Sequence, residues 1–250
     1  MNGATTAQAD PQHRKRSLSA TMLTAFCHYP RQFESRYIQG KKDPANGAMV
    51  QSKVWHGTVE HNYRQKIVSG LDLPLAQIQE FYAAIFDQAF QAEEIVLRRG
   101  DTLAKLKDQG LAIATVYHQT IAPTVRPLLV EERFRVSLGE DFPYDLVGVY
   151  DLIDQDGVII DHKAFARAPS QEEADDNIQL GIYALAYRLR MGKLEKGLRL
   201  DIIVKNKPPQ PLQLSTTRTN DDCRRLLGIC ERAAQALQAG VVDTNQWRKP

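Results

Sequence analysis

The sequence predicts an α+β protein (the broad α/β class), in which a helical N-terminal half precedes a mixed sheet flanked by helices. Two observations predict this class. Up to about Ala122 the apolar residues recur with helical spacing, whereas from Pro127 onward short β-branched segments alternate between apolar and polar residues. The 250 residues are 43% hydrophobic and 25% charged, which is enough for a packed core and excludes a disordered chain.

The first half begins with a polar segment and continues as helices. Residues 1–16 mix small polar residues with a basic knot and have no periodicity, so we expect a disordered tail. A first helix should begin after Ser19, whose side chain suits an N-cap. Between glycine and proline breaks, we expect further helices over residues 48–68, 75–97 and 102–122.

The second half carries the strands. We expect them over residues 128–138, 145–154, 158–165, 197–206 and 211–217, with helices over residues 170–192 and 219–240. Short turns join the first three strands, so these should form an antiparallel meander. Since no break would split the sheet, we expect a single domain over residues 17–250, mainly helical over 17–125 and with the core sheet and its helices over 126–240.

Composition and missing motifs exclude several classes of protein. The net charge of +2 excludes a protein held to nucleic acid by bulk charge alone. Three cysteines without a C-x-x-C pair favour a reducing compartment, so we expect a cytoplasmic location. We expect no membrane association, because no apolar run reaches the length of a membrane span. The phosphate-binding glycine motifs are missing, so we expect no bound nucleotide.

The hairpin around residues 154–157 predicts a group of ionisable side chains. If the loop has three residues, with Gly157 in the left-handed conformation, Asp151 lies opposite Asp161 on the neighbouring strand. Lys163 then shares their face of the sheet. Two facing carboxylates about 5 Å apart repel each other unless a cation lies between them, and such oxygen ligands suit Mg²⁺ or Mn²⁺. The alternative is an exposed pair of Asp161 and Lys163 at a strand edge.

Four motifs occur in a fixed order along the chain, namely GTVEH at 57–61, GVYDLI at 148–153, IIDHK at 159–163 and QLGIY at 179–183. This ordered set resembles the RecB-like branch of the PD-(D/E)XK nuclease superfamily, and the resemblance covers roughly Ser19 to Gly192. It implies a restriction-endonuclease-like mixed sheet with the core order α-β-β-β-α-β. The element order expected above agrees with that fold.

The resemblance also implies the roles of particular residues. His61, Asp151 and Asp161 would be metal ligands, together with the backbone carbonyl of His162. Lys163 would act with Asp161 and Asp151 in catalysis, by orienting or activating the attacking water. In addition, Gln179 and Tyr183 would bind the substrate strand or brace the metal ligands, although helix packing is an alternative for them.

Other histidines and acids receive little weight. His61 by itself could be an ordinary exposed histidine, and we assign no function to His28, His56 or His118. Glu132 is expected to face solvent, with support of the metal ligands as the alternative.

The resemblance implies a metal-dependent deoxyribonuclease, most readily an exonuclease acting on ends or single strands of DNA in recombination, repair or phage-type DNA processing. A helicase, recombinase or annealing protein would be its partner. One alternative is an inactive or weakly active nuclease-fold subunit that binds DNA, and another is a sequence-specific endonuclease. DNA contacts could come from six basic and three aromatic residues, namely Lys41, Lys42, Lys53, Arg64, Lys66, Arg167, Tyr37, Trp55 and Tyr63.

The cysteines depart from one part of the family pattern. Cluster-bearing relatives use one cysteine near the first helix, which Cys27 matches, and three near the C-terminus, which this sequence lacks. Cys223 and Cys230 fall on one helical face, as small buried residues do. Because a cluster requires four ligands, we expect no iron-sulfur cluster.

Overall fold

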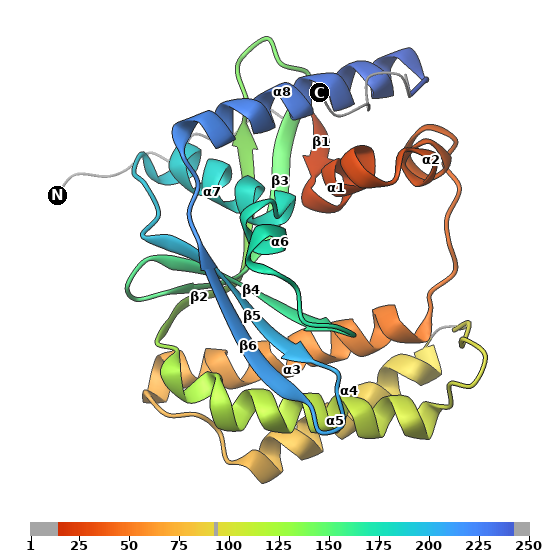
Figure 1. Ribbon diagram of the computed structural model, residues 1–250, viewed down its shortest axis with the longest axis vertical. Coiled ribbons are helices and arrows are strands. Elements are labelled where there is room, and N and C mark those ends of the chain that lie inside the picture. The colour runs from red at the N-terminus through yellow and green to blue at the C-terminus, as the bar shows by residue number, and fades with distance from the viewer. Residues whose placement is uncertain (1–14, 93–94, 243–250) are drawn as a thin grey trace, which may run out of the picture.

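The computed structural model describes residues 15–92 and 95–242. Within them, a six-stranded mixed sheet has helices on both faces (Figure 1), which confirms the predicted fold class. The expected tail over residues 1–14 lies outside the described residues.

The helices and strands follow one another in the predicted general order. The N-terminal part contains β1 (Arg16–Ser19), α1 (Ala20–His28), α2 (Pro30–Phe33), the π-helix η2 (Glu34–Ile38), α3 (Gly47–Ser69), α4 (Leu75–Ala92), α5 (Leu103–Thr120) and the short 3₁₀ helix η3 (Ala122–Thr124). The C-terminal part contains β2 (Pro127–Ser137), β3 (Tyr144–Asp154), β4 (Val158–Phe165), α6 (Gln171–Asp175), α7 (Ile178–Met191), β5 (Gly197–Val204), β6 (Gln210–Thr216) and α8 (Asn220–Ala239).

The long strand β3 organises the sheet. On one side it pairs antiparallel with β2 along most of its length. On its other side, β1 runs parallel to its first half and β4 antiparallel to its last residues. The helices α6 and α7 then carry the chain to β5, which lies parallel to β4, and β6 closes the sheet as an antiparallel edge. The predicted antiparallel meander of β2, β3 and β4 is therefore confirmed.

Two hydrophobic cores lie on opposite faces of this sheet. One core packs the sheet against α1, α7 and α8, and the other packs it against α3, α4 and α5 (Figure 1). The strand residues alternate between them, so that Ile159 of β4 belongs to the first core and Ile160 to the second. The sheet is thus buried by helices on both sides.

Three details differ from the prediction. Arg16, expected in the tail, begins β1 and pairs with Tyr144 of β3. The expected helix over residues 170–192 is divided in two, because Asn177 adopts an extended conformation and its side chain caps α7 by accepting from the N–H of Leu180. The helical segment expected after Ser19 is divided between α1, which ends at His28, and α2, which begins at Pro30, because proline has no N–H to continue the hydrogen-bond ladder.

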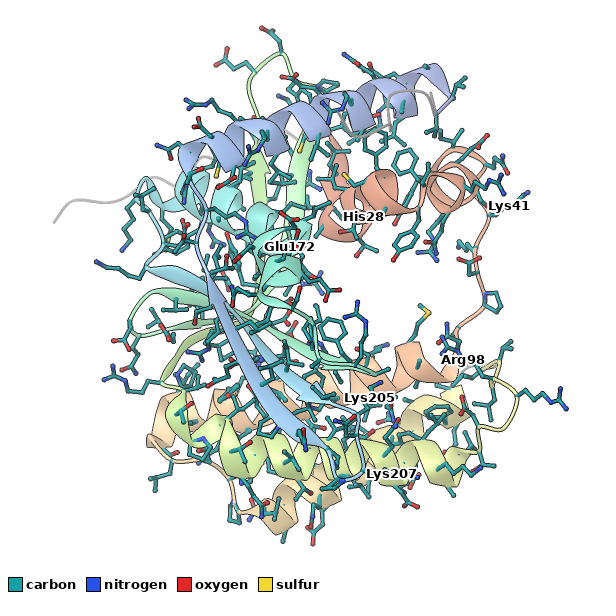
Figure 2. The ribbon with its side chains drawn as sticks, viewed as in Figure 1. His28, Lys41, Arg98, Glu172, Lys205 and Lys207 are labelled. Carbon is teal, nitrogen blue, oxygen red and sulfur yellow. The ribbon has the colours of Figure 1, made fainter. Side chains whose placement is uncertain are left out.

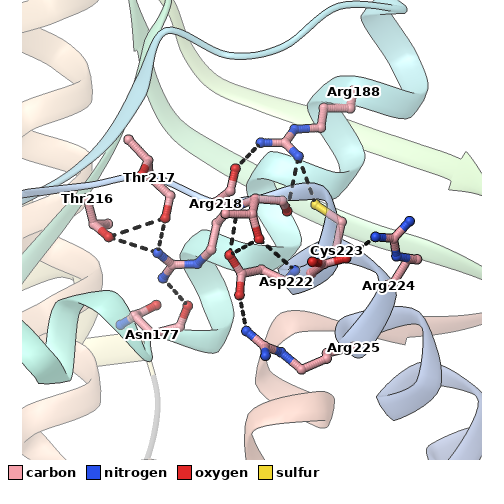
Figure 3. A network of polar contacts seen from close by, with 11 residues as sticks. Asn177, Arg188, Thr216, Thr217, Arg218, Asp222, Cys223, Arg224 and Arg225 are labelled. Atoms are coloured by element: carbon pink, nitrogen blue, oxygen red, sulfur yellow. Dashed lines mark hydrogen bonds and ion pairs between the residues drawn. The ribbon is translucent and has the colours of Figure 1, made fainter.

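A polar network fixes the last helix to α7 (Figure 3). The guanidinium of Arg188 on α7 donates to the backbone oxygen of Arg218 at 2.6 Å and to that of Thr219 at 3.3 Å, just before α8 begins. It also forms an ion pair with Glu195. Since only 13% of the Arg188 side chain is exposed, these contacts are well sheltered from solvent.

None of the helices in the described part of the chain is long and apolar enough to span a bilayer.

Candidate active site

The hairpin between β3 and β4 has the predicted register. Gly157 adopts a φ of +85°, and its N–H donates to the carbonyl of Asp154 at 3.0 Å. Leu152 pairs with Ile160, and the same register places Asp151 opposite Asp161. The backbone pairing of β3 with β4 ends at Leu152. Beyond it, Oδ2 of Asp151 accepts from the backbone N–H of His162 at 2.8 Å.

Asp161 and Lys163 form a sheltered ion pair. The Asp161 side chain is completely buried, and the Lys163 Nζ lies 2.8 Å from its Oδ2 with 25% of the lysine side chain exposed. The alternative of a solvent-exposed pair at a strand edge is therefore wrong. A buried carboxylate next to a partly exposed cation can hold that cation toward a ligand from solvent.

Burial changes the acidity of this pair. The pKa of Asp161 is raised to about 6. Burial is the largest cause and the negative charge of Asp151 adds to it, whereas the positive charge of Lys163 opposes both only in part. Burial lowers the pKa of Lys163, but the charges of Asp161 and Asp151 outweigh it, so the net pKa lies above the usual lysine value. Lys163 is therefore a cation at neutral pH.

Three side chains from three elements bring possible metal ligands together. His56 of α3, Glu131 of β2 and Asp151 of β3 each offer a ligand atom within 4.8 Å of the others. The Nδ1 of His56 lies 3.5 Å from Oδ2 of Asp151 and 3.9 Å from Oε1 of Glu131. Neither Asp161 nor His61 belongs to such a group within the described residues.

The backbone explains why Glu131 reaches this cluster. Glu131 has a φ of +50°, the one positive φ among the described residues other than glycine. Tyr150 packs into the core of α1, α7 and α8, whereas Leu152 packs into the opposite core, so β3 changes faces at Asp151. Val130 and Phe134 show the same change on β2. The two carboxylates therefore meet where the paired strands change faces.

Glu132, the neighbour noted from the sequence, points elsewhere and forms an ion pair with Arg190 on α7.

His61, the ligand implied by the resemblance, contacts another element. Its ring stacks on Phe81 of α4, with centroids 4.0 Å apart and planes 7° apart, and the residue is exposed. His56 lies five residues earlier on the same helix, so the side chains of His56 and His61 project about 140° apart around the helix axis. The sequence contained His56 in the stretch HGTVEH, but only the packing of α3 against β2 and β3 identifies it.

His162 anchors β4 on the opposite face from Asp161. Its Nδ1 lies 3.1 Å from the hydroxyl of Tyr117, which in turn lies 2.8 Å from that of Tyr63. Burial lowers the pKa of His162, so its ring is neutral. Because its backbone N–H holds Asp151, this buried chain of rings helps to fix the carboxylate.

Several residues expected to contact DNA are instead structural. Trp55 and Tyr63 are 2% and 0% exposed, so their rings are not available to stack on bases. Lys66 is 8% exposed and pairs with Asp72 at 2.8 Å between Nζ and Oδ2. Their helical spacing reflects the core of α3 rather than a DNA contact.

Gln179 and Tyr183 form a pair on α7. The Gln179 Nε2 donates to the Tyr183 hydroxyl at 2.8 Å. Tyr183 is only 2% exposed and packs against Phe134 and Tyr150, whereas Gln179 is partly exposed. In this arrangement Tyr183 orients Gln179, which lines the same cleft as Lys163.

The candidate site residues line two different clefts. The first has a volume of about 550 Å³ and contains His56, His61 and Glu131 in its walls, along α3 and α4. The second has a volume of about 670 Å³ and contains Lys163 and Gln179. The buried carboxylates of Asp151 and Asp161 lie on the strands between them.

The ligand cluster fits a divalent cation. It has two carboxylates and one imidazole, and Oδ2 of the buried Asp161 has the Lys163 Nζ at 2.8 Å. Carboxylates suit Mg²⁺ and Mn²⁺, and the imidazole adds affinity for transition metals such as Mn²⁺. A cation would also offset the repulsion between Asp151 and Asp161 that helps to raise the pKa of Asp161.

Comparison with known proteins indicates a family and a fold. A family model described as the PD-(D/E)XK nuclease superfamily matches residues 17–249. No curated protein matches. Among solved structures, the crystal structure of a "Putative exonuclease" from Eubacterium rectale is similar, with a TM-score of 0.55 and 14% sequence identity, over 97% of this chain and 89% of the other. At that identity the structural likeness supports the fold alone.

Proposed function

Because the chain belongs to the PD-(D/E)XK nuclease superfamily, whose members hydrolyse nucleic acids, we propose that it is a Mg²⁺- or Mn²⁺-dependent deoxyribonuclease. The main support is the convergence of His56, Glu131 and Asp151 next to the buried pair of Asp161 and Lys163. We propose His56 as the histidine ligand, with His61 as the alternative that the resemblance implies. The Asp161 carboxylate and the carbonyl of His162 remain further candidate ligands.

The proposed mechanism assigns a task to each group. A bound metal ion would polarise the scissile phosphate and lower the pKa of a water molecule. Lys163 stays protonated, so it would stabilise negative charge that develops on the phosphate rather than remove a proton from water. Asp161 holds Lys163 in place, and Gln179, oriented by Tyr183, would donate or accept a hydrogen bond at the substrate strand.

We further propose that the enzyme is an exonuclease acting on ends or single strands, in recombination, repair or phage-type DNA processing in the cytoplasm. The protein from Eubacterium rectale that is described as a "Putative exonuclease" has a similar fold, and this likeness supports the choice. A helicase, recombinase or annealing protein would supply the strand. A sequence-specific endonuclease and a DNA-binding subunit without activity are the alternatives that an assay must distinguish.

The decisive experiment uses end-labelled single- and double-stranded DNA with Mg²⁺, Mn²⁺ or EDTA. Wild-type protein should cleave with metal and not with EDTA, and Lys163→Ala should lose cleavage while keeping its melting temperature within a few degrees. His56→Ala and His61→Ala form a matched pair on one helix. We expect the first to lose activity by at least about 100-fold and the second by less than about threefold. The reverse result would restore His61 as the ligand.

A further inference from the structure

The second cleft is lined by residues of different chemistry. Lys163 of β4 and Gln179 of α7 belong to its lining. The other walls come from the end of α1, from the segment after β4 and from α6. His28 on α1 and Glu172 on α6, both labelled in Figure 2, belong to different walls of this cleft.

Part of the cleft lining suits a flat, partly apolar group. Phe165, Ile178 and Leu200 line the cleft, and so does Tyr29, which has 58% of its surface exposed. An exposed aromatic ring next to apolar side chains is a typical surface for a nucleobase, because every base can stack on it. The volume of about 670 Å³ is sufficient for a nucleoside.

The charges in the cleft do not cancel. Arg167 forms an ion pair with Glu173 that also caps α6, and Lys163 is paired with Asp161. This leaves Glu172 and Asp176, both exposed and in no ion pair within the described residues, on α6 and the turn after it. Arg218 donates to the backbone oxygens of Ala174 and Asn177 next to this turn, but it does not line the cleft. The carboxylates that line this wall therefore outnumber its lining cations.

We propose that this cleft binds the terminal nucleoside of a DNA strand, and that it selects ends carrying a hydroxyl over ends carrying a phosphate. This inference rests on the proposed nuclease function. With the scissile phosphate at Lys163 and the base near Tyr29, the outer end of the nucleoside points toward Glu172 and Asp176. A terminal phosphate, with up to two negative charges, would meet unpaired carboxylates there, whereas a hydroxyl can donate a hydrogen bond to them.

The first cleft suits the rest of the strand. Lys53 lies in its wall and is in no ion pair within the described residues, whereas the nearby Arg64 is paired with Glu60. Phosphates that follow the scissile bond would therefore meet an unpaired cation rather than unpaired carboxylates. The contrast between the two clefts gives a bound strand a direction.

The test compares a single-stranded oligonucleotide with hydroxyls at both ends against versions with a phosphate at the 5′ or the 3′ end. We expect a phosphate at one end only to slow cleavage by at least about tenfold in wild-type protein. The double variant Glu172→Gln/Asp176→Asn should lose most of this discrimination. The matched control Glu140→Gln/Asp141→Asn removes the same charge from the exposed turn between β2 and β3 and should keep it.

The same oligonucleotides are also compared by fluorescence polarisation in EDTA, so the result does not depend on cleavage. Weaker binding of one phosphorylated end, relieved in the Glu172→Gln/Asp176→Asn variant, would support the subsite even if the protein failed to cleave DNA. Equal binding and cleavage of all three oligonucleotides by wild-type protein would overturn it, as would discrimination that the double variant leaves unchanged. Absent cleavage with discriminating binding would instead count against the nuclease proposal alone.

Discussion

At the scale of single residues, Glu131 combines strain with a candidate metal ligand. A residue with a Cβ atom in the left-handed region costs on the order of 1 kcal/mol or more. The positive φ of Glu131 lies where β2 and β3 change faces, and it turns the carboxylate toward His56 and Asp151. Local strain of this kind persists where the surrounding structure holds it and is concentrated at functional sites.

Substitutions of Glu131 should separate the effect of its backbone strain on stability from the effect of its carboxylate on metal-dependent activity. We expect Glu131→Gly to be more stable than Glu131→Gln without metal, by about 1 kcal/mol, since glycine adopts a positive φ without strain. Both variants should lose metal-dependent activity, because both lack the carboxylate. Denaturant unfolding in EDTA measures the first effect and the DNA cleavage assay the second. Equal stabilities would show that the positive φ costs nothing here.

The acidity of His56 predicts how metal affinity depends on pH. Burial lowers the pKa of His56, but the nearby carboxylates of Glu131 and Asp151 raise it by more, so the net pKa lies above the usual histidine value. A proton therefore competes with the metal for the imidazole at near-neutral pH. We expect the affinity for Mn²⁺, measured by calorimetry, to fall as the pH is lowered from about 8 to about 6. His61→Ala should show the same dependence, and a pH-independent affinity would exclude His56 as a ligand.

At the scale of elements, the local patterns predicted most helices and strands, while pairing between distant segments did not follow from them. The ends of α3 follow from Asn46 as N-cap and Gly70 as left-handed C-cap, both readable in the sequence. The four residues of β1 are too few to show alternation, and they form a strand only because β3 lies next to them. His56 and Glu131 escaped the sequence analysis for the same reason.

The start of α8 offers a prediction about acid stability. The Asp222 carboxylate accepts from the backbone N–H of Thr219 at 2.7 Å, and the backbone N–H of Asp222 donates to the Thr219 hydroxyl at 3.1 Å. Together these two hydrogen bonds form a capping box. These hydrogen bonds to Thr219 lower the pKa of Asp222 to about 2. Because the folded-state pKa is depressed, the carboxylate stabilises the fold above its unfolded pKa, and this contribution is lost as the pH falls through about 2.

We therefore expect Asp222→Asn to lower stability at neutral pH by about 0.5 to 1 kcal/mol and to have little effect near pH 2. Urea unfolding followed by circular dichroism at several pH values provides the measurement. The matched control is Asp221→Asn, in the same helical turn, because Asp221 pairs with Arg224 and makes no cap hydrogen bond. A difference between wild type and Asp222→Asn that did not change with pH would contradict the role of the charge.

At the scale of the whole molecule, the two cores share one sheet, and the candidate site lies where they meet. His56 lies on α3, which packs in one core, and the core of α1, α7 and α8 contains Tyr183, which is hydrogen-bonded to Gln179. The strands β2, β3 and β4 supply residues to both cores. The expected single domain over residues 17–250 stays a prediction, and cooperative unfolding is its physical consequence.

Metal binding should therefore stabilise the molecule as a unit. Mn²⁺ or Mg²⁺ bound only to the native state would add about 2.7 kcal/mol at a hundredfold excess over the Kd, and so raise the melting temperature. Since the ligands come from α3, β2 and β3, we expect one calorimetric transition that moves as a whole. Asp151→Asn should remove the shift, because it takes away a ligand charge while the amide oxygen can still accept from the N–H of His162. Two transitions, of which only one responds to metal, would show that the helical part over 17–125 unfolds separately from the sheet.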